Sequence, residues 1–189
     1  MAQKHLADFQ KFCAKPKSKK LPRKVIWKPP NAGLLKTNFD GAIFEDLGAA
    51  GIGAVVRNSS GEVLAAQFEI IPLPSSIVAL ETIAARWAIL FVRELGFSGT
   101  ILEGDSREAI SAIKKQSFQH PMVGHLVKDI VSLVNMFQYY SFSHTCRQGN
   151  VLAHVLARWA RLSFPTLVWM NSVTMDNYRF FVSDILVMK

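Results

Sequence analysis

The chain has 189 residues, half of them hydrophobic, which gives room for one domain with a proper core and a tail but would make two domains crowded. Its two cysteines, Cys13 and Cys146, exclude a disulfide framework and a paired-cysteine zinc site and favour a reducing intracellular compartment, nuclear or cytoplasmic. Charges interrupt the first 25 residues, so no secretory signal is expected. The late apolar stretch 162–186 is broken by Pro165 and by charged residues, so we expect no membrane contact.

The positive charge is concentrated at the N-terminus. Residues 1–30 hold nine lysines and arginines against one acid, Asp8, which accounts for the whole formal net charge of +8. Prolines keep such a segment extended, and a disordered basic tail is therefore predicted over 1–30. The tail suits non-specific attraction to phosphates, and a solubilising or targeting role is an equally open alternative. The rest divides into a domain at 31–163 and a C-terminal extension at 164–189 that is expected to pack on it.

The first half of the domain predicts an antiparallel meander followed by a long helix. Three segments with β character, at 34–42, 51–58 and 62–71, are joined by short links rich in turn residues. Ser75 and Ser76 then offer an N-cap, and apolar residues recur at helical spacing from Ile77 to Leu95.

The second half begins with a central apolar strand, Thr100 to Asp105, and a helix start follows it at once. Helical patterns cover 107–116 and 122–137, an alternating aromatic and β-branched segment covers 138–146, and a last helix covers 151–162. The predicted order is β-β-β-α-β-α-α-β-α. This is an α/β fold in which a mixed five-stranded sheet is flanked by helices.

Three carboxylates are predicted to converge at one edge of this sheet. Asp105 comes at the carboxyl end of the central strand, where open α/β sheets place their ligands, and Asp40 comes at the end of an early strand. Glu81 lies on the apolar side of the long helix, where a lone carboxylate is costly to bury without a cation. Together these residues predict a divalent-metal site.

Two of the three carboxylates also have a purely structural explanation. Asp105, with Glu108 three residues later, is a possible helix cap, and Asp40 with Gly41 is a possible turn. Glu81 is the hardest of the three to explain in this way.

The motifs around these residues together resemble a ribonuclease H domain, in particular the kind found in plant non-LTR retroelement reverse transcriptases. The pieces that carry the resemblance are Asn38-Phe39-Asp40-Gly41-Ala42, the strand Gly51 to Arg57, Glu81, Glu103-Gly104-Asp105-Ser106, Phe142-Ser143-His144, and Asn150 with Ala153 to Ala157. The resemblance implies endonucleolytic hydrolysis of the RNA strand of an RNA–DNA hybrid with two Mg²⁺ ions. It also implies that Asp40, Glu81 and Asp105 are three of four metal-binding carboxylates and that His144 assists proton transfer or product release.

The sequence departs from the family pattern at the fourth carboxylate. The position ten residues after His144 is His154, where the family places an Asp. An imidazole is softer than a carboxylate, so the site is expected to lean toward Mn²⁺. An ordinary helix histidine is the alternative for His154. The basic protrusion with which some family members hold the hybrid also has no counterpart beyond Lys114 and Lys115.

Two functional hypotheses follow. The first is a metal-dependent ribonuclease H-type enzyme that uses Asp40, Glu81, Asp105 and His144, with His154 as a weakened fourth ligand. The second is a nucleic-acid-binding module, derived from a retroelement, that kept the fold and lost the reaction. A structural role without nucleic acid is a third and weaker alternative. In the first two, the expected partner is an RNA–DNA hybrid or another nucleic acid, and a monomer is expected.

Overall fold

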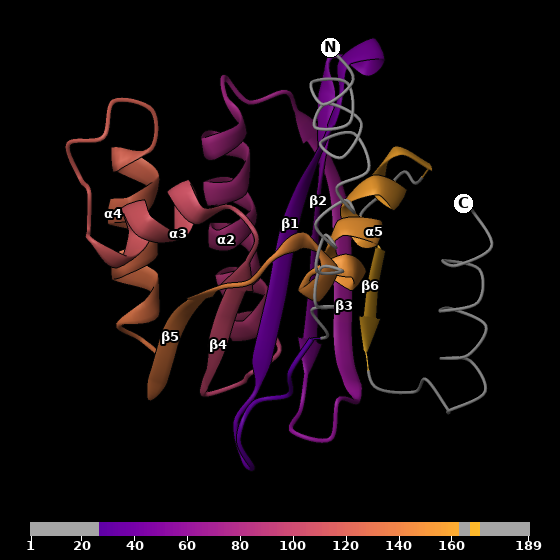
Figure 1. Ribbon diagram of the computed structural model, residues 1–189, viewed down its shortest axis with the longest axis vertical. Helices are drawn as coiled ribbons and strands as arrows, with labels where there is room; N and C mark the ends of the chain where they lie inside the picture. Colours follow the sequence, from indigo (N-terminus) through magenta and orange to yellow (C-terminus); the bar gives the residue numbers. More distant parts are fainter. Residues whose placement is uncertain (1–26, 163–166, 171–189) are drawn as a thin grey trace, which may run out of the picture.

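The computed structural model describes residues 27–162 and 167–170 of the chain (Figure 1). Its helices and strands follow the predicted β-β-β-α-β-α-α-β-α order and add one short strand at the end. In chain order they are β1 (Lys36–Phe44), β2 (Ala49–Arg57), β3 (Val63–Pro72), α2 (Ile77–Glu94), β4 (Gly99–Gly104), α3 (Arg107–Lys114), α4 (Gly124–Val134), β5 (Tyr139–His144), α5 (Val151–Trp159) and β6 (Leu167–Met170).

The sheet has the strand order β5-β4-β1-β2-β3-β6. Strands β1, β2 and β3 form the predicted antiparallel meander, while β4 runs parallel to both β1 and β5. The predicted five-stranded mixed sheet is therefore confirmed, and β6, from the predicted C-terminal extension, pairs antiparallel with β3 as a sixth strand. The remainder of the extension, and residues 1–26 of the predicted basic tail, lie outside the described residues.

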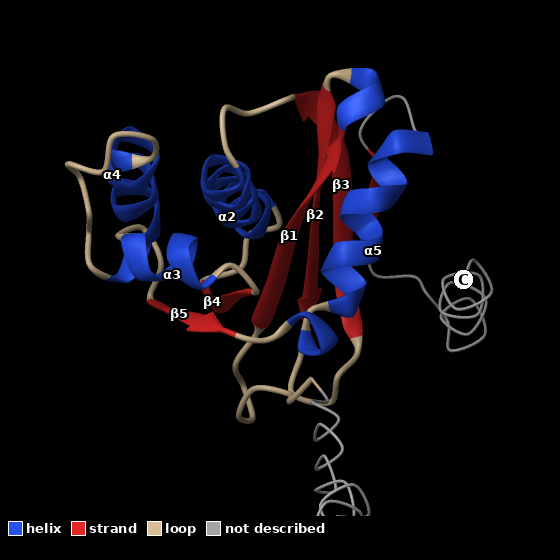
Figure 2. Cartoon of the chain, turned by 45° about the horizontal axis from the view of Figure 1, so that its top comes forward, coloured by secondary structure: helices blue, strands red, loops and turns tan. Residues whose placement is uncertain are grey.

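Helices cover both faces of the sheet. Figure 2 shows α2, α3 and α4 on one face and α5 on the other. Alternation along β1 sends Phe39, which is fully buried, into the larger core under α2, and it sends Asn38 and Asp40 toward α5. Within the described ranges no helix combines the length and hydrophobicity that a membrane span requires.

The small residues of the sequence decide how closely the helices approach the sheet. Fully buried alanines at 84, 85 and 88 face the larger core from α2. On the opposite face, α5 crosses β2 where Gly51 and Gly53 leave room for the helix backbone. A side chain at Gly53 would collide with the backbone of Ala153 and Ala157. Because Gly53 is also the β2 partner of Asp40, this contact sets how near α5 comes to the predicted metal site.

We expect Gly53→Ala to lower the free energy of unfolding by about 2 kcal/mol, since an added methyl group in a filled core forces the backbone to shift. Chemical denaturation of parent and variant measures the loss. Ser60→Ala, in the exposed turn after the same strand, is the control and should change stability by less than about 0.5 kcal/mol. Equal denaturation midpoints for Gly53→Ala and the parent would contradict the close packing of α5 on β2.

Candidate metal centre

Asp40, Glu81 and Asp105 converge as predicted. Each offers a carboxylate oxygen that lies within 4.8 Å of the other two. Pairing between β1 and β4 covers only Lys36 to Asn38 on β1, so Asp40 and Asp105 both lie just beyond the last paired residues. Glu81, the fifth residue of α2, reaches the same place from the helix that packs on β1.

The structural explanations for Asp105 and Asp40 are wrong. Ser106, and not Asp105, caps α3, because its hydroxyl accepts a hydrogen bond from the backbone N–H of Ala109 at 3.3 Å. Asp40 and Gly41 are paired with β2 inside a strand that continues to Phe44. The expectation that Asp40 ends its strand is corrected in the same way: it lies where the pairing with β4 ends, and β1 itself continues.

Burial and mutual repulsion perturb this cluster strongly. Asp40 is fully buried and Glu81 is 5% exposed. Burial raises the pKa of Glu81 to about 9, with the charges of Asp40 and Asp105 adding to the effect. Burial and the charge of Asp40 also raise the pKa of Asp105. The cluster therefore resists being fully ionised unless a cation is present.

Two oxygens of the cluster are buried without a donor. Neither Oδ1 of Asp40 nor Oε2 of Glu81 accepts a hydrogen bond from any of the described residues. A buried carboxylate oxygen that accepts no hydrogen bond lowers the stability of the fold, and a bound cation is one explanation for its presence. Because the ligand atoms that these three carboxylates offer to a metal are all oxygen, the cluster suits hard divalent cations such as Mg²⁺ and Mn²⁺.

His154 belongs to the site but lies at its side. Its Nδ1 is 2.7 Å from Oδ2 of Asp40, so it is more than an ordinary helix histidine. When Nδ1 carries the ring hydrogen it donates to the ionised carboxylate of Asp40, and in that form it offers no lone pair to a metal. His154 is also outside the group of three whose oxygens lie within 4.8 Å of one another. Its role as a fourth ligand stays a prediction.

His144 lies on the opposite side of the cluster, at the end of β5. Its Nε2 is 3.2 Å from the backbone oxygen of Asp105, and its side chain is exposed. It is thus next to the cluster and in contact with solvent, as a residue that exchanges protons requires.

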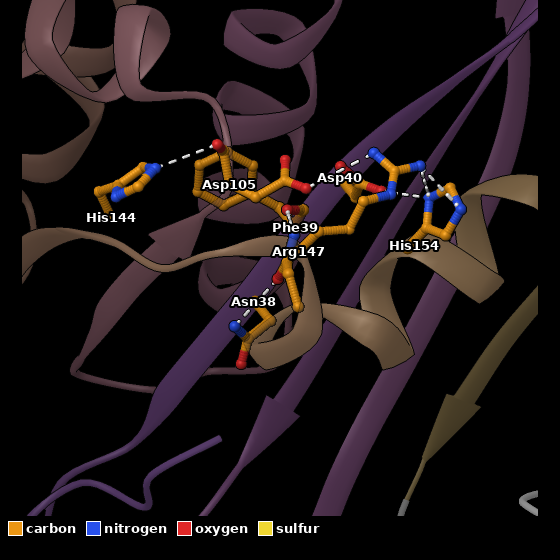
Figure 3. A network of polar contacts seen from close by, with 8 residues as sticks. Asn38, Phe39, Asp40, Asp105, His144, Arg147 and His154 are labelled. Atoms are coloured by element: carbon orange, nitrogen blue, oxygen red, sulfur yellow. Dashed lines mark hydrogen bonds and ion pairs between the residues drawn. The ribbon is translucent and has the colours of Figure 1, made fainter. Parts of the chain in front are cut away.

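Arg147, which no sequence motif indicated, lies in the centre of the site (Figure 3). It comes from the short 3₁₀ turn Arg147–Gly149 before α5. Its Nη1 lies 3.6 Å from Oδ2 of Asp105, and its Nη2 lies 2.9 Å from Nε2 of His154. The only available signal was its position between His144 and Asn150, both of which belong to the family pattern.

A buried polar network holds the elements that carry the site. Asn38 donates through Nδ2 to Oε1 of Glu103 at 3.1 Å and to Oδ1 of Asn150 at 3.0 Å. These three residues precede Asp40, Asp105 and α5, and Lys36 pairs with Glu103 at 3.1 Å. The network therefore fixes β1, β4 and the start of α5 relative to one another, which sets the spacing of the site residues.

Trp27 contacts the outer side of this polar network. Its Nε1 donates to Oδ1 of Asn38 at 2.9 Å, and the Arg57 guanidinium lies 3.6 Å from the centre of its ring. The last residues of the predicted tail are thus part of the folded body at Trp27.

Comparison with known proteins gives consistent results. Residues 38–160 match the family model described as reverse transcriptase-like. No curated protein sequence matches the chain significantly. Among solved structures, ribonuclease H1 from the archaeon Halobacterium salinarum is 25% identical with a TM-score of 0.62, and the match covers 68% of this chain and 98% of that chain.

Two further structures support the same fold. The N-terminal ribonuclease H domain of a Mycobacterium tuberculosis protein is 23% identical with a TM-score of 0.60, covering 67% of this chain and 91% of that chain. LC11 ribonuclease H1, isolated from compost and crystallised with an RNA/DNA hybrid, is 20% identical with a TM-score of 0.60, covering 68% of this chain and 99% of that chain. The fold predicted from the sequence is thereby confirmed as the ribonuclease H fold.

Proposed function

The chain belongs to the reverse transcriptase-like family and has the ribonuclease H fold, and from this premise we propose that it is a metal-dependent endoribonuclease that hydrolyses the RNA strand of an RNA–DNA hybrid. The observation that carries the proposal is the cluster of Asp40, Glu81 and Asp105, with two buried oxygens that have no donor among the described residues. A polyanionic substrate and a cluster of carboxylates repel each other, so cations are needed between them.

We assign the metal site to Asp40, Glu81 and Asp105, with His154 as a side ligand in a form that has lost its Nδ1 hydrogen. Bound divalent cations, expected to be two Mg²⁺ or Mn²⁺, would supply a nucleophile at neutral pH and offset charge on the leaving oxygen. His144 is assigned to proton exchange, because its exposed ring is next to Asp105.

A second candidate is a nucleic-acid-binding module without catalysis. Two observations favour it: His154 occupies the position of the fourth family carboxylate, and Arg147 places a positive charge beside Asp105. Residues 115–123, between α3 and α4, also form only turns, so the described part of the chain has no helical protrusion there to grip a hybrid.

Cleavage of a hybrid with an end-labelled RNA strand, in Mg²⁺ and separately in Mn²⁺, tests the proposal. We expect cuts within the RNA strand in both metals, faster in Mn²⁺, and none in excess chelator. The same RNA as a single strand and a DNA duplex of the same sequence are the controls and should stay intact. Hybrid binding, measured by fluorescence anisotropy, without cleavage in either metal would instead support the binding module.

A further inference from the structure

A positively charged side chain lies within the candidate metal centre. In Figure 3 the Arg147 guanidinium lies between Asp105 and His154, beside Asp40. Its Nη2 is 2.9 Å from Nε2 and 3.0 Å from Nδ1 of His154, and its Nη1 is 3.6 Å from Oδ2 of Asp105. With His154 held by Asp40 at 2.7 Å, the contacts link the fully buried carboxylate of Asp40 to the half-buried carboxylate of Asp105.

We propose that Arg147 is a resident counter-cation, which neutralises the carboxylate cluster when no metal is bound and competes with the metal ion for it. The proposal rests on the metal site of the proposed function. It adds that metal binding is an exchange, in which the ion replaces a cation that is part of the chain. The cluster should therefore bind metal more weakly than its three carboxylates alone would.

The charge of Arg147 is suited to this role. A guanidinium keeps its charge throughout the range in which proteins are folded. Burial and the charge of Asp40 raise the pKa of Glu81 and of Asp105, and the positive charge of Arg147 lowers both pKa values in opposition. Its charge thus reaches two carboxylates of the cluster that come from different elements of the fold.

The position of Arg147 makes it displaceable. Its side chain is 62% exposed, whereas that of Asp105 is 12% exposed. The residue belongs to a turn of three residues, and at 3.6 Å its contact with Asp105 is an ion pair too long to be a hydrogen bond. The guanidinium can therefore leave toward solvent without unfolding α5, while the carboxylates stay in place.

Metal titration by calorimetry, with Mg²⁺ or Mn²⁺ and no nucleic acid, tests the competition in the full chain. We expect Arg147→Gln to bind the first metal ion roughly tenfold more tightly than the parent at low salt. A change of this size is what removing one partly screened positive charge a few ångströms from the ion should produce. The gain should shrink at high salt, because an exposed charge is screened. Arg147→Lys keeps the charge and should stay within about threefold of the parent.

Arg161→Gln is the matched control, since it removes an exposed arginine from an ion pair with Asp46 outside the cluster. Its metal affinity should equal that of the parent. Unchanged or weaker metal binding by Arg147→Gln would overturn the proposal, since a competitor must hinder the ion.

Melting in chelator is an independent measurement. Arg147→Gln should melt at a lower temperature than both the parent and Arg161→Gln, because the carboxylates then repel one another unopposed. An equal melting temperature would overturn the counter-cation role. A parent that binds no metal would contradict the proposed function, and the chelator measurement would still decide whether Arg147 neutralises the cluster.

Discussion

Asp105→Asn is expected to lower the rate of hybrid cleavage by more than about 100-fold. Changing a residue that only supports a metal ligand costs up to about 100-fold in activity, and the loss of a ligand itself should cost more. The substitution keeps the shape of the side chain but removes one charge from a cluster whose oxygens lie within 4.8 Å of one another. The helix that follows should be unaffected, because Ser106 provides its cap.

The measurement combines cleavage with melting in chelator. The variant should melt at or above the temperature of the parent, since it removes one of three mutually repelling acids. Glu108→Gln is the control: its side chain is 70% exposed in the first turn of α3, so it removes a nearby charge outside the cluster and should cleave normally. Cleavage by Asp105→Asn at the rate of the parent would remove Asp105 from the metal site.

The sequence was sufficient to predict the order of the elements and the three carboxylates because both depend on local patterns. Ser76 before an apolar stripe predicted the start of α2, and the structure places its hydroxyl 3.1 Å from the N–H of Ala79. An acid on that stripe, Glu81, had few explanations other than a shared cation. Asp105 followed from its position after an apolar strand.

What the sequence did not reveal are the long-range contacts of the site. Asn38 and Asn150 are 112 positions apart in the chain and meet at 3.0 Å. Arg147 is ordinary in its local sequence, and only the approach of α5 to β1 brings it to Asp105. That approach depends on the room above Gly53, which becomes evident only when the partner of β2 is known.

The strand β6 was missed for a related reason. Its pairing partner is β3, a hundred residues earlier, and Leu167 to Met170 form too short a run to indicate a strand alone. The sequence predicted β3 as part of the antiparallel meander, but the identity of its outer neighbour depends on tertiary contacts.

Glu81→Gln is expected to change how the stability of the metal-free protein depends on pH. The pKa of Glu81 is raised from 4.5 to about 9 by burial and by the charges of Asp40 and Asp105. Between these pH values the folded protein holds a proton that the unfolded chain has released. The free energy of unfolding therefore falls as the pH rises through this window, with a slope of at most about 1.4 kcal/mol per pH unit for one proton, and it levels off above the folded pKa.

Glutamine is neutral at every pH, so the variant lacks this part of the slope. In chelator, the melting temperature of Glu81→Gln should exceed that of the parent at pH 8 to 9, and the difference should narrow as the pH falls below 4.5, where Glu81 of the parent is mostly protonated in the unfolded chain as well as in the folded protein. Glu94→Gln, at the exposed end of the same helix, should follow the parent throughout. Added Mg²⁺ should then stabilise the parent more than Glu81→Gln, because only the parent keeps all three carboxylates to bind it. Parallel melting curves for parent and Glu81→Gln across this pH range would show that Glu81 does not hold a proton in the metal-free fold, and its place in a mutually repelling cluster would be lost.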